Sequence, residues 1–145
     1  MSTTSTEAAQ NIAVWKAVDL EGYAATLAPK ASGAQALAVD SLGNFGPTHN
    51  AVMVYRAANG EAEFHETAAD FTIIEAGAGD LIVGGAVVEP RVTGPGEIRG
   101  SSVEGGTTYH VEPGDIINIP AKTTHQMTVP PGGSVTYIVV KIITK

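Results

Sequence analysis

The sequence has no cysteine, few basic residues and no long apolar run, and each absence excludes a class of function. Without cysteine the chain cannot form disulfides, thiolate metal sites or cysteine nucleophiles. Only 8 Lys and Arg accompany 15 Asp and Glu, which gives a formal net charge of −7. We therefore expect no nucleic acid and no anionic membrane as a partner, because binding phosphate groups requires clustered positive charge.

Signals that would direct the chain into or across a membrane are also missing. No stretch approaches the roughly eighteen consecutive apolar residues that a membrane-spanning helix needs. The opening sequence MSTTSTEAAQ has neither the basic nor the apolar region of a secretory signal. We expect a cytoplasmic protein, and the lack of cysteine is compatible with a reducing compartment.

Length and hydrophobic content predict one folded domain. The chain has 145 residues, of which 43% are hydrophobic, enough for a real core. The polar, unpatterned residues 1–12 are expected to form a flexible arm. The only plausible helix is AVDLEGYAATLAPK, residues 17–30, which Asp19 could cap and Pro29 would stop.

From residue 49 onward, short β-rich segments alternate with turn sequences such as Asn-Gly and Pro-Gly-Asp. Many short strands at this spacing favour an antiparallel sandwich or barrel, and no helical pattern interrupts them to form βαβ units. The sequence RVTGPGEIRGSSVEGG, residues 91–106, could be a hairpin or a long loop. These segments include AVMVYRA, EAEFHE, DFTIIEA, LIVGGAVV, TTYHV, IINIPA, HQMTV and SVTYIVVKI.

Two motifs carry a resemblance to a known family. In GDIINIPAKTTHQM, residues 114–127, Gly114 is followed after five residues by Pro120, and His125 lies five residues further on. This spacing resembles the second motif of small single-domain cupins of the cupin 2 type, although Lys122 replaces a glycine of that motif. The family's asparagine four residues after the histidine is Val129 here.

The first cupin motif is present in a degraded form in EFHETAADFTIIEAG, residues 63–77. Its second histidine is replaced by Thr67 or, when the count runs back from the final glycine, by Glu66. The glycine, first histidine, acid and final glycine correspond to Gly60, His65, Asp70 and Gly77.

The resemblance implies an all-β fold, namely a double-stranded β-helix or jelly-roll cupin barrel with a short N-terminal helix. On this interpretation residues 49–145 form the barrel, and the short helix in residues 13–48 packs on it. Small cupins include dioxygenases, isomerases and lyases, and they usually pair, so the resemblance implies a homodimer and leaves the reaction class open.

Strand alternation predicts which side chains meet inside such a barrel. His65 and Asp70 are five residues apart and share a face only if the chain bends within ETAA. Asp70, Thr72 and Ile74 share one face of their strand. The expected lining of the pocket is Met53, Thr72, Ile74 and Met127.

The candidate site therefore contains two imidazoles and one carboxylate, from His65, His125 and Asp70. Such a set suits a divalent ion of Fe, Mn, Zn or Ni and leaves positions open for water or a small-molecule substrate. Glu66 could be a fourth ligand or a general base, and either Tyr55 or Arg56 could point inward to hold an anionic or hydroxylated ligand. We take Glu66 and Tyr55 as the catalytic candidates.

Three functions are compatible with these residues. The first is a metal-dependent enzyme acting on a small organic substrate by dioxygenase, isomerase or lyase chemistry. The second is a metal-free module that binds or senses a small molecule, motivated by the missing histidine at Thr67. The third is a structural barrel with a vestigial site.

Overall fold

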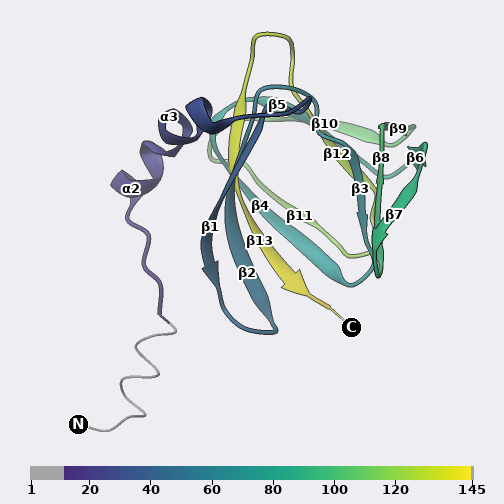
Figure 1. The fold of residues 1–145 in the computed structure, drawn as a ribbon, viewed down its shortest axis with the longest axis horizontal. Helices are drawn as coiled ribbons and strands as arrows, with labels where there is room; N and C mark the ends of the chain where they lie inside the picture. The colour runs from purple at the N-terminus through teal and green to yellow at the C-terminus, as the bar shows by residue number, and fades with distance from the viewer. Residues whose placement is uncertain (1–11, 145) are drawn as a thin grey trace, which may run out of the picture.

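The computed structural model describes residues 12–144 and is built mainly of antiparallel strands in two curved sheets around a common interior (Figure 1). The five-stranded sheet has the order β1 (Leu37–Asn44), β2 (His49–Arg56), β13 (Val135–Ile143), β4 (Ala68–Gly77) and β11 (Ile116–Ile119). The six-stranded sheet has the order β10 (Thr107–Val111), β5 (Gly79–Val83), β12 (His125–Thr128), β3 (Ala62–His65), β8 (Glu97–Gly100) and β7 (Arg91–Gly94). A separate ribbon joins β6 (Ala86–Val88) to β9 (Ser102–Glu104). The predicted all-β class is confirmed.

The centre of the five-stranded sheet is β13, the C-terminal apolar strand. It pairs along nearly its whole length with β2 on one side and with β4 on the other. Burial along β4 alternates residue by residue over most of the strand, as expected for a strand with one face on a core. Between the two sheets lies the interior cluster, which includes Ile74, Leu81, Val135 and Tyr137.

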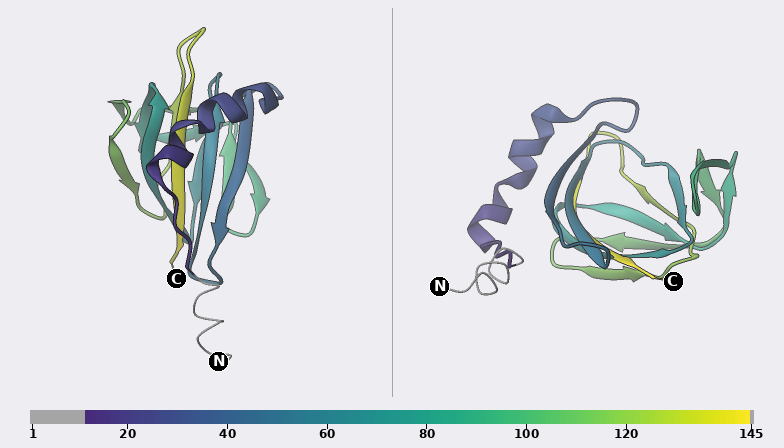
Figure 2. Two further views of the ribbon diagram at one scale, coloured as in Figure 1. Left: turned by 90° about the vertical axis from the view of Figure 1, so that its left-hand side faces the viewer. Right: turned by 60° about the horizontal axis from the view of Figure 1, so that its bottom comes forward.

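The N-terminal helix lies on the outer face of the five-stranded sheet (Figure 2). The predicted helix over residues 17–30 is divided at Gly22 into α2 (Ala17–Glu21) and α3 (Tyr23–Leu27), and a 3₁₀ turn, η1 (Ala28–Lys30), follows. Leu27 is buried against this face of the sheet, in an outer cluster with Ala38, Leu42, Met53 and Ile138.

The sheet begins earlier in the chain than residue 49, where we placed the start of the barrel. Residues 37–44 form β1, which pairs with β2 at the sheet edge. The sequence signal is weak because only Ala38 and Leu42 of this strand are buried, and the register shifts between Ser41 and Gly43. Of the expected flexible arm, residues 1–11 lie outside the described residues.

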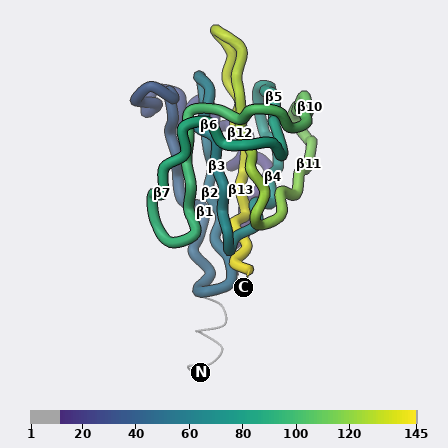
Figure 3. The backbone as a smooth tube through the Cα atoms, turned by 90° about the vertical axis from the view of Figure 1, so that its right-hand side faces the viewer, coloured from purple at the N-terminus to yellow at the C-terminus, as the bar shows by residue number. Residues whose placement is uncertain are grey.

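Within the segment 91–106, which could have been a hairpin or a long loop, residues 91–100 form a hairpin and Ser102–Glu104 form β9, which pairs with β6. Strands β7 and β8 pair antiparallel, and Gly96 turns the chain with a φ of +69°. Figure 3 shows this hairpin at the outer side of the molecule. Because β8 also pairs with β3, Glu97 lies directly opposite His65.

No helix within residues 12–144 is both long and apolar enough to cross a bilayer.

Candidate functional site

The chain bends directly after His65, as the spacing of the first motif requires. His65 ends β3 in the six-stranded sheet, residues 66 and 67 form the bend, and β4 starts the return in the other sheet. Both His65 and Asp70 therefore point between the sheets, with 3% and 7% of their surfaces exposed. His125, at the start of β12, is buried beside them.

The three predicted metal ligands lie together. Atom Oδ2 of Asp70 is 3.2 Å from Nε2 of His65 and 3.4 Å from Nε2 of His125. The two imidazole rings have centroids 5.3 Å apart. One carboxylate oxygen thus lies between two imidazole nitrogens that come from different strands.

The other nitrogen of each ring is anchored. Nδ1 of His65 donates a hydrogen bond to Oε1 of Glu97 over 2.7 Å, and Nδ1 of His125 donates to the backbone oxygen of Thr123 over 3.1 Å. These acceptors fix the orientation of both rings and keep Nε2 directed toward the centre of the site. Metal-binding histidines characteristically have such an acceptor on the nitrogen that does not bind the metal.

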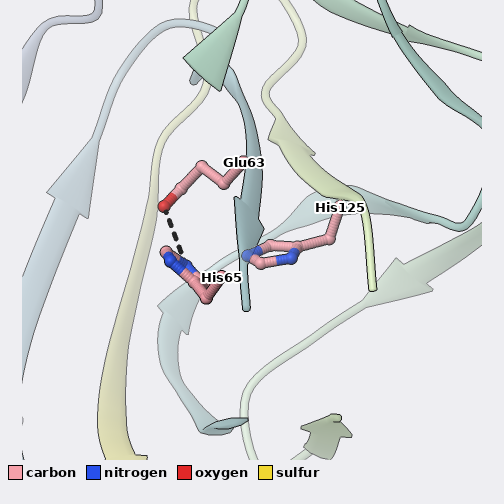
Figure 4. Close-up of side chains that lie close together, drawn as sticks. All are labelled: Glu63, His65 and His125. Carbon is pink, nitrogen blue, oxygen red and sulfur yellow. Dashed lines mark ion pairs between the residues drawn. The ribbon is translucent and has the colours of Figure 1, made fainter. Parts of the chain in front are cut away.

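Glu63 joins the site although sequence analysis did not select it. Ligand atoms of Glu63, His65 and His125 all lie within 4.8 Å of one another, and Figure 4 shows these three side chains together. The sequence could have indicated Glu63, because residues two apart on a strand share a face and Glu63 lies two positions before His65. The degraded His-x-His pattern is thus replaced in space by a Glu-x-His pair, Glu63 and His65, whose acid lies two residues before the histidine instead of two residues after it.

Two basic side chains also reach the site. Nζ of Lys141 is 2.8 Å from Oδ1 of Asp70 and 3.4 Å from Nε2 of His65. Arg56 approaches Glu63, with Nη2 3.7 Å from Oε2. Of the two alternatives at the end of β2, Arg56 therefore points inward.

The contacts shift the pKa values of the acidic and imidazole groups strongly. Burial opposes the charged form of Asp70, but its contacts with His125, His65 and Lys141 hold its pKa well below the usual range. Burial likewise opposes ionisation of Glu63, yet His65, His125 and Arg99 lower its pKa to about 2. Burial disfavours the imidazolium of His65, but Asp70 and Glu63 raise its pKa to about 9.

A cavity of about 130 Å³ adjoins these groups. Its polar lining is Arg56, Glu63, Asp70, Thr72, His125 and Lys141, and its apolar lining is Val52, Val54, Leu81, Ile119, Met127, Tyr137 and Val139. Thr72 and Met127 are thus in the expected place. Ile74 is buried in the interior cluster but does not line the cavity.

Met53 and Tyr55 turn away from the cavity, which corrects two expectations. Both pack in or against the outer cluster beneath the helix. Alternation explains this, since Val52, Val54 and Arg56 occupy the inward positions of β2 and the residues between them must face outward. Tyr55 therefore has no access to a substrate in the cavity.

Glu66 also lies away from the site. It is exposed in the bend after β3, where its backbone N–H donates to the oxygen of Gly96 and its side chain lies over that glycine. Neighbouring residues on an extended chain face opposite ways, so the inward position of His65 directs Glu66 outward. The carboxylate expected there is supplied by Glu63.

Solved structures with the same arrangement of strands decide the fold. Rru_A2000 from Rhodospirillum rubrum, a cupin-2 domain, aligns with 74% of this chain and 60% of its own, at 17% sequence identity and a TM-score of 0.55. The fold is that of a small cupin. The polyketide cyclase RemF from Streptomyces resistomycificus shares this cupin fold at 18% identity and a TM-score of 0.52, over 73% of this chain and 64% of its own.

The Streptomyces protein Pac13, described as a nucleoside dehydratase, has the same fold at 12% identity and a TM-score of 0.53, over 75% of this chain and 71% of its own. The chain spans less than two thirds of the length of RemF and Rru_A2000. No protein-family model and no curated protein sequence matches it. At these identities the comparisons establish the cupin fold, and the chemistry must be argued from the site.

Proposed function

We propose that the protein is an enzyme that binds one divalent metal ion through Glu63, His65 and His125 and acts on a small organic molecule in the adjoining cavity. The observation that carries this proposal is the orientation of the two imidazoles. Both Nε2 atoms lie within 3.4 Å of Oδ2 of Asp70, and Nε2 of His65 is also 3.4 Å from Oε1 of Glu63, while both Nδ1 atoms are held by other acceptors. The ligand set predicted from sequence, with Asp70 as the carboxylate, shares both histidines with this one.

The donor set fits the proposed ion. Two imidazole nitrogens and one carboxylate oxygen are typical ligands of Zn, Mn, Fe or Ni, and three protein ligands leave positions for substrate. Asp70 provides a second carboxylate next to both histidines. When bound, such an ion would polarise a substrate oxygen and so favour removal of a neighbouring proton or loss of a leaving group.

The surrounding residues favour proton-transfer chemistry, that is, a lyase or isomerase, over oxidation. Asp70 and Lys141 form an ion pair at the cavity wall, which holds the ammonium of Lys141, a proton donor, within reach of a substrate. The lowered pKa of Asp70 makes its carboxylate a weak base, so we assign it the role of positioning Lys141. Apolar side chains such as Leu81 and Met127 line the rest of the cavity and would exclude water from the reacting groups. The shared fold with a cyclase and a dehydratase supports this reaction class.

Elemental analysis by ICP-MS tests the proposal on untagged wild type, His125→Ala and the control His110→Ala, each after loading with Zn, Mn, Fe or Ni and removal of unbound ion. We expect near-stoichiometric metal in wild type and in His110→Ala, because His110 is exposed and outside the cluster. We expect loss of metal from His125→Ala. Equal metal content in the two variants, or none in wild type, would refute the proposal.

The second candidate is a metal-free cupin that binds a small molecule without catalysis. The observation that favours it is the ammonium of Lys141, which already supplies positive charge to Asp70 and contacts His65. For such a protein, a ligand would raise the melting temperature equally with and without a chelator. For the metal-dependent enzyme, the chelator would reduce that stabilisation.

The oligomeric state and the cytoplasmic location stay predictions. A homodimer is supported by the large apolar side chains at the N-terminal end of the described chain, since Ile12, Val14 and Val18 are each at least 70% exposed.

A further inference from the structure

We propose that the substrate is a small organic anion with an apolar body, and that Arg56 binds its carboxylate or equivalent negative group. This inference rests on the proposed function, because it names the class of molecule that the same cavity would accept. It is carried by the fixed position of Arg56, by the charge balance around the site and by the lining of the cavity.

Arg56 is a buried and preorganised cation. Only 7% of its surface is exposed, and it lines the cavity. Nε donates a hydrogen bond to the hydroxyl of Tyr137 over 2.8 Å, and Nη1 donates to Oε1 of Gln35 over 2.6 Å. Gly60 leaves room for the guanidinium, because a Cβ there would lie 2.7 Å from Cζ and from Nη1 of Arg56.

The third nitrogen of Arg56 is available for a ligand. Among the described residues, its ionic partner is Glu63, whose Oε2 is 3.7 Å from Nη2, longer than a hydrogen bond. Glu63 is also shared, since its Oε1 lies 3.4 Å from His65 and 3.6 Å from Arg99. A guanidinium that is held through two nitrogens and lines a cavity is a suitable anchor for a carboxylate.

The charges around the site leave room for an additional anion. Three carboxylates face three permanent cations, namely Glu63, Asp70 and Glu97 against Arg56, Arg99 and Lys141. Glu61, which also influences Arg56, has its own ion pair with Arg91. With His65 neutral, as metal binding requires, a divalent ion added to this set gives a surplus of positive charge in a partly buried site. A bound carboxylate would offset part of that surplus.

The cavity limits the size and character of the remainder of the molecule. Its volume of about 130 Å³ is close to that of an engineered protein cavity, about 150 Å³, that binds benzene. Part of the cavity wall is apolar and is formed by residues that include Val54, Leu81 and Met127. The fitting ligand is therefore an anion of about six non-hydrogen atoms with a hydrocarbon body.

Isothermal titration calorimetry with butyrate and butyramide tests the proposal, because the two probes have nearly the same shape and differ in charge. We expect the zinc-loaded protein to bind butyrate about tenfold to hundredfold more tightly than butyramide, the range that a hydrogen bond to a charged group contributes. Equal affinities for the two probes, or no binding of butyrate at millimolar concentration, would overturn the proposal.

Variants assign the discrimination to Arg56. Arg56→Met should reduce the preference for butyrate to about twofold or less, and the exposed control Lys30→Met should retain the wild-type preference. Should Arg56→Met fail to fold, Tyr137→Phe removes only the hydroxyl that accepts from Nε and should weaken butyrate binding severalfold. Tyr109→Phe, a 52% exposed tyrosine, is its control. Wild-type preference in a folded Arg56→Met variant, or in Tyr137→Phe where Arg56→Met does not fold, would overturn the assignment.

Failure of this inference can be distinguished from failure of the proposed function. Binding of zinc without any preference for butyrate overturns the substrate class alone. A preference for butyrate that depends on Arg56 in chelator-treated protein, together with no metal binding, supports the anion site and refutes the metal-dependent enzyme.

Discussion

At the scale of single residues, the site predicted from the sequence and the candidate site in the structure differ in one glutamate, Glu66 in the prediction and Glu63 in the structure. Glu63 lies among the candidate ligands, whereas Glu66 is exposed in the following bend. We expect Glu63→Gln to weaken zinc binding by at least about tenfold, because an amide is a poorer ligand than a carboxylate. Glu66→Gln should leave the affinity unchanged. Competition titration against a zinc-chelating dye measures both, and weaker binding in Glu66→Gln alone would contradict the site as described.

Lys141 should oppose metal binding. Its ammonium lies 2.8 Å from Asp70 and 3.4 Å from Nε2 of His65, so an added cation would be repelled at short range. Replacing it by methionine also frees the Asp70 carboxylate to bind metal. We expect Lys141→Met to bind zinc about tenfold more tightly than wild type in the same titration. Weaker binding would instead mean that Lys141 supports the ligand arrangement.

How far the sequence predicts this site depends on the range of the contact involved. The expectation that His65 and Asp70 meet was correct. The two residues lie on strands that follow each other in the chain, and the sequence ETAA between them predicts a bend. Thr72 and Met127 followed from alternation along their own strands. These are local inferences that require no knowledge of how distant strands pair.

The residues that were missed depend on long-range pairing. Lys141 is 71 positions from Asp70 in the sequence. The sequence alone predicts only that Lys141 lies near the polar end of an apolar strand, and its contact with Asp70 follows from the pairing of β13 with β4. Glu97 reaches His65 through the pairing of β8 with β3, and β8 belongs to the region that could have been a loop. Register between distant strands is set by the packed core as a whole, so single-segment patterns do not predict it.

At the scale of secondary-structure elements, the end of β4 depends on a glycine. Gly77 has a φ of +70°, and a Cβ there would lie 2.0 Å from the backbone oxygen of Ser134 on the neighbouring turn. We expect Gly77→Ala to lower the free energy of unfolding by about 2 kcal/mol or more, from backbone strain plus this clash. Urea unfolding at constant pH measures the change.

Gly132→Ala isolates the contribution of the clash. Gly132 has a similar φ of +80° but nothing within 4 Å of the added Cβ, so only the backbone strain of about 1 kcal/mol is expected. Equal losses in the two variants would show that the contact with Ser134 contributes nothing, and that the turn adjusts freely.

At the scale of the whole molecule, surface and interior have different electrostatic characters. The chain carries a formal net charge of −7, yet the carboxylates around the site are matched one for one by Arg56, Arg99 and Lys141. The acidic surplus is therefore carried by the rest of the chain. An anionic substrate would be repelled at long range and attracted only within the cavity, so its association should become faster as salt screens the surface.

The same interior charges predict how the stability of the metal-free protein depends on pH. His65 has a pKa raised to about 9, so its contribution is complete below its ordinary pKa of 6.5 and is lost as pH rises through 9. The pKa of Glu63 is lowered to about 2, so its contribution is complete above its ordinary pKa of 4.5 and is lost as pH falls toward 2. We expect a maximum in the free energy of unfolding between these limits, measured by urea titration with a chelator present.

His65→Gln should flatten the decline from pH 6.5 to 9, and the exposed control His110→Gln should largely retain it. Because metal binding requires neutral His65, saturating zinc should abolish the decline that His65 causes between pH 6.5 and 9 in wild type. An unchanged decline in His65→Gln would contradict the assignment of this titration to the site.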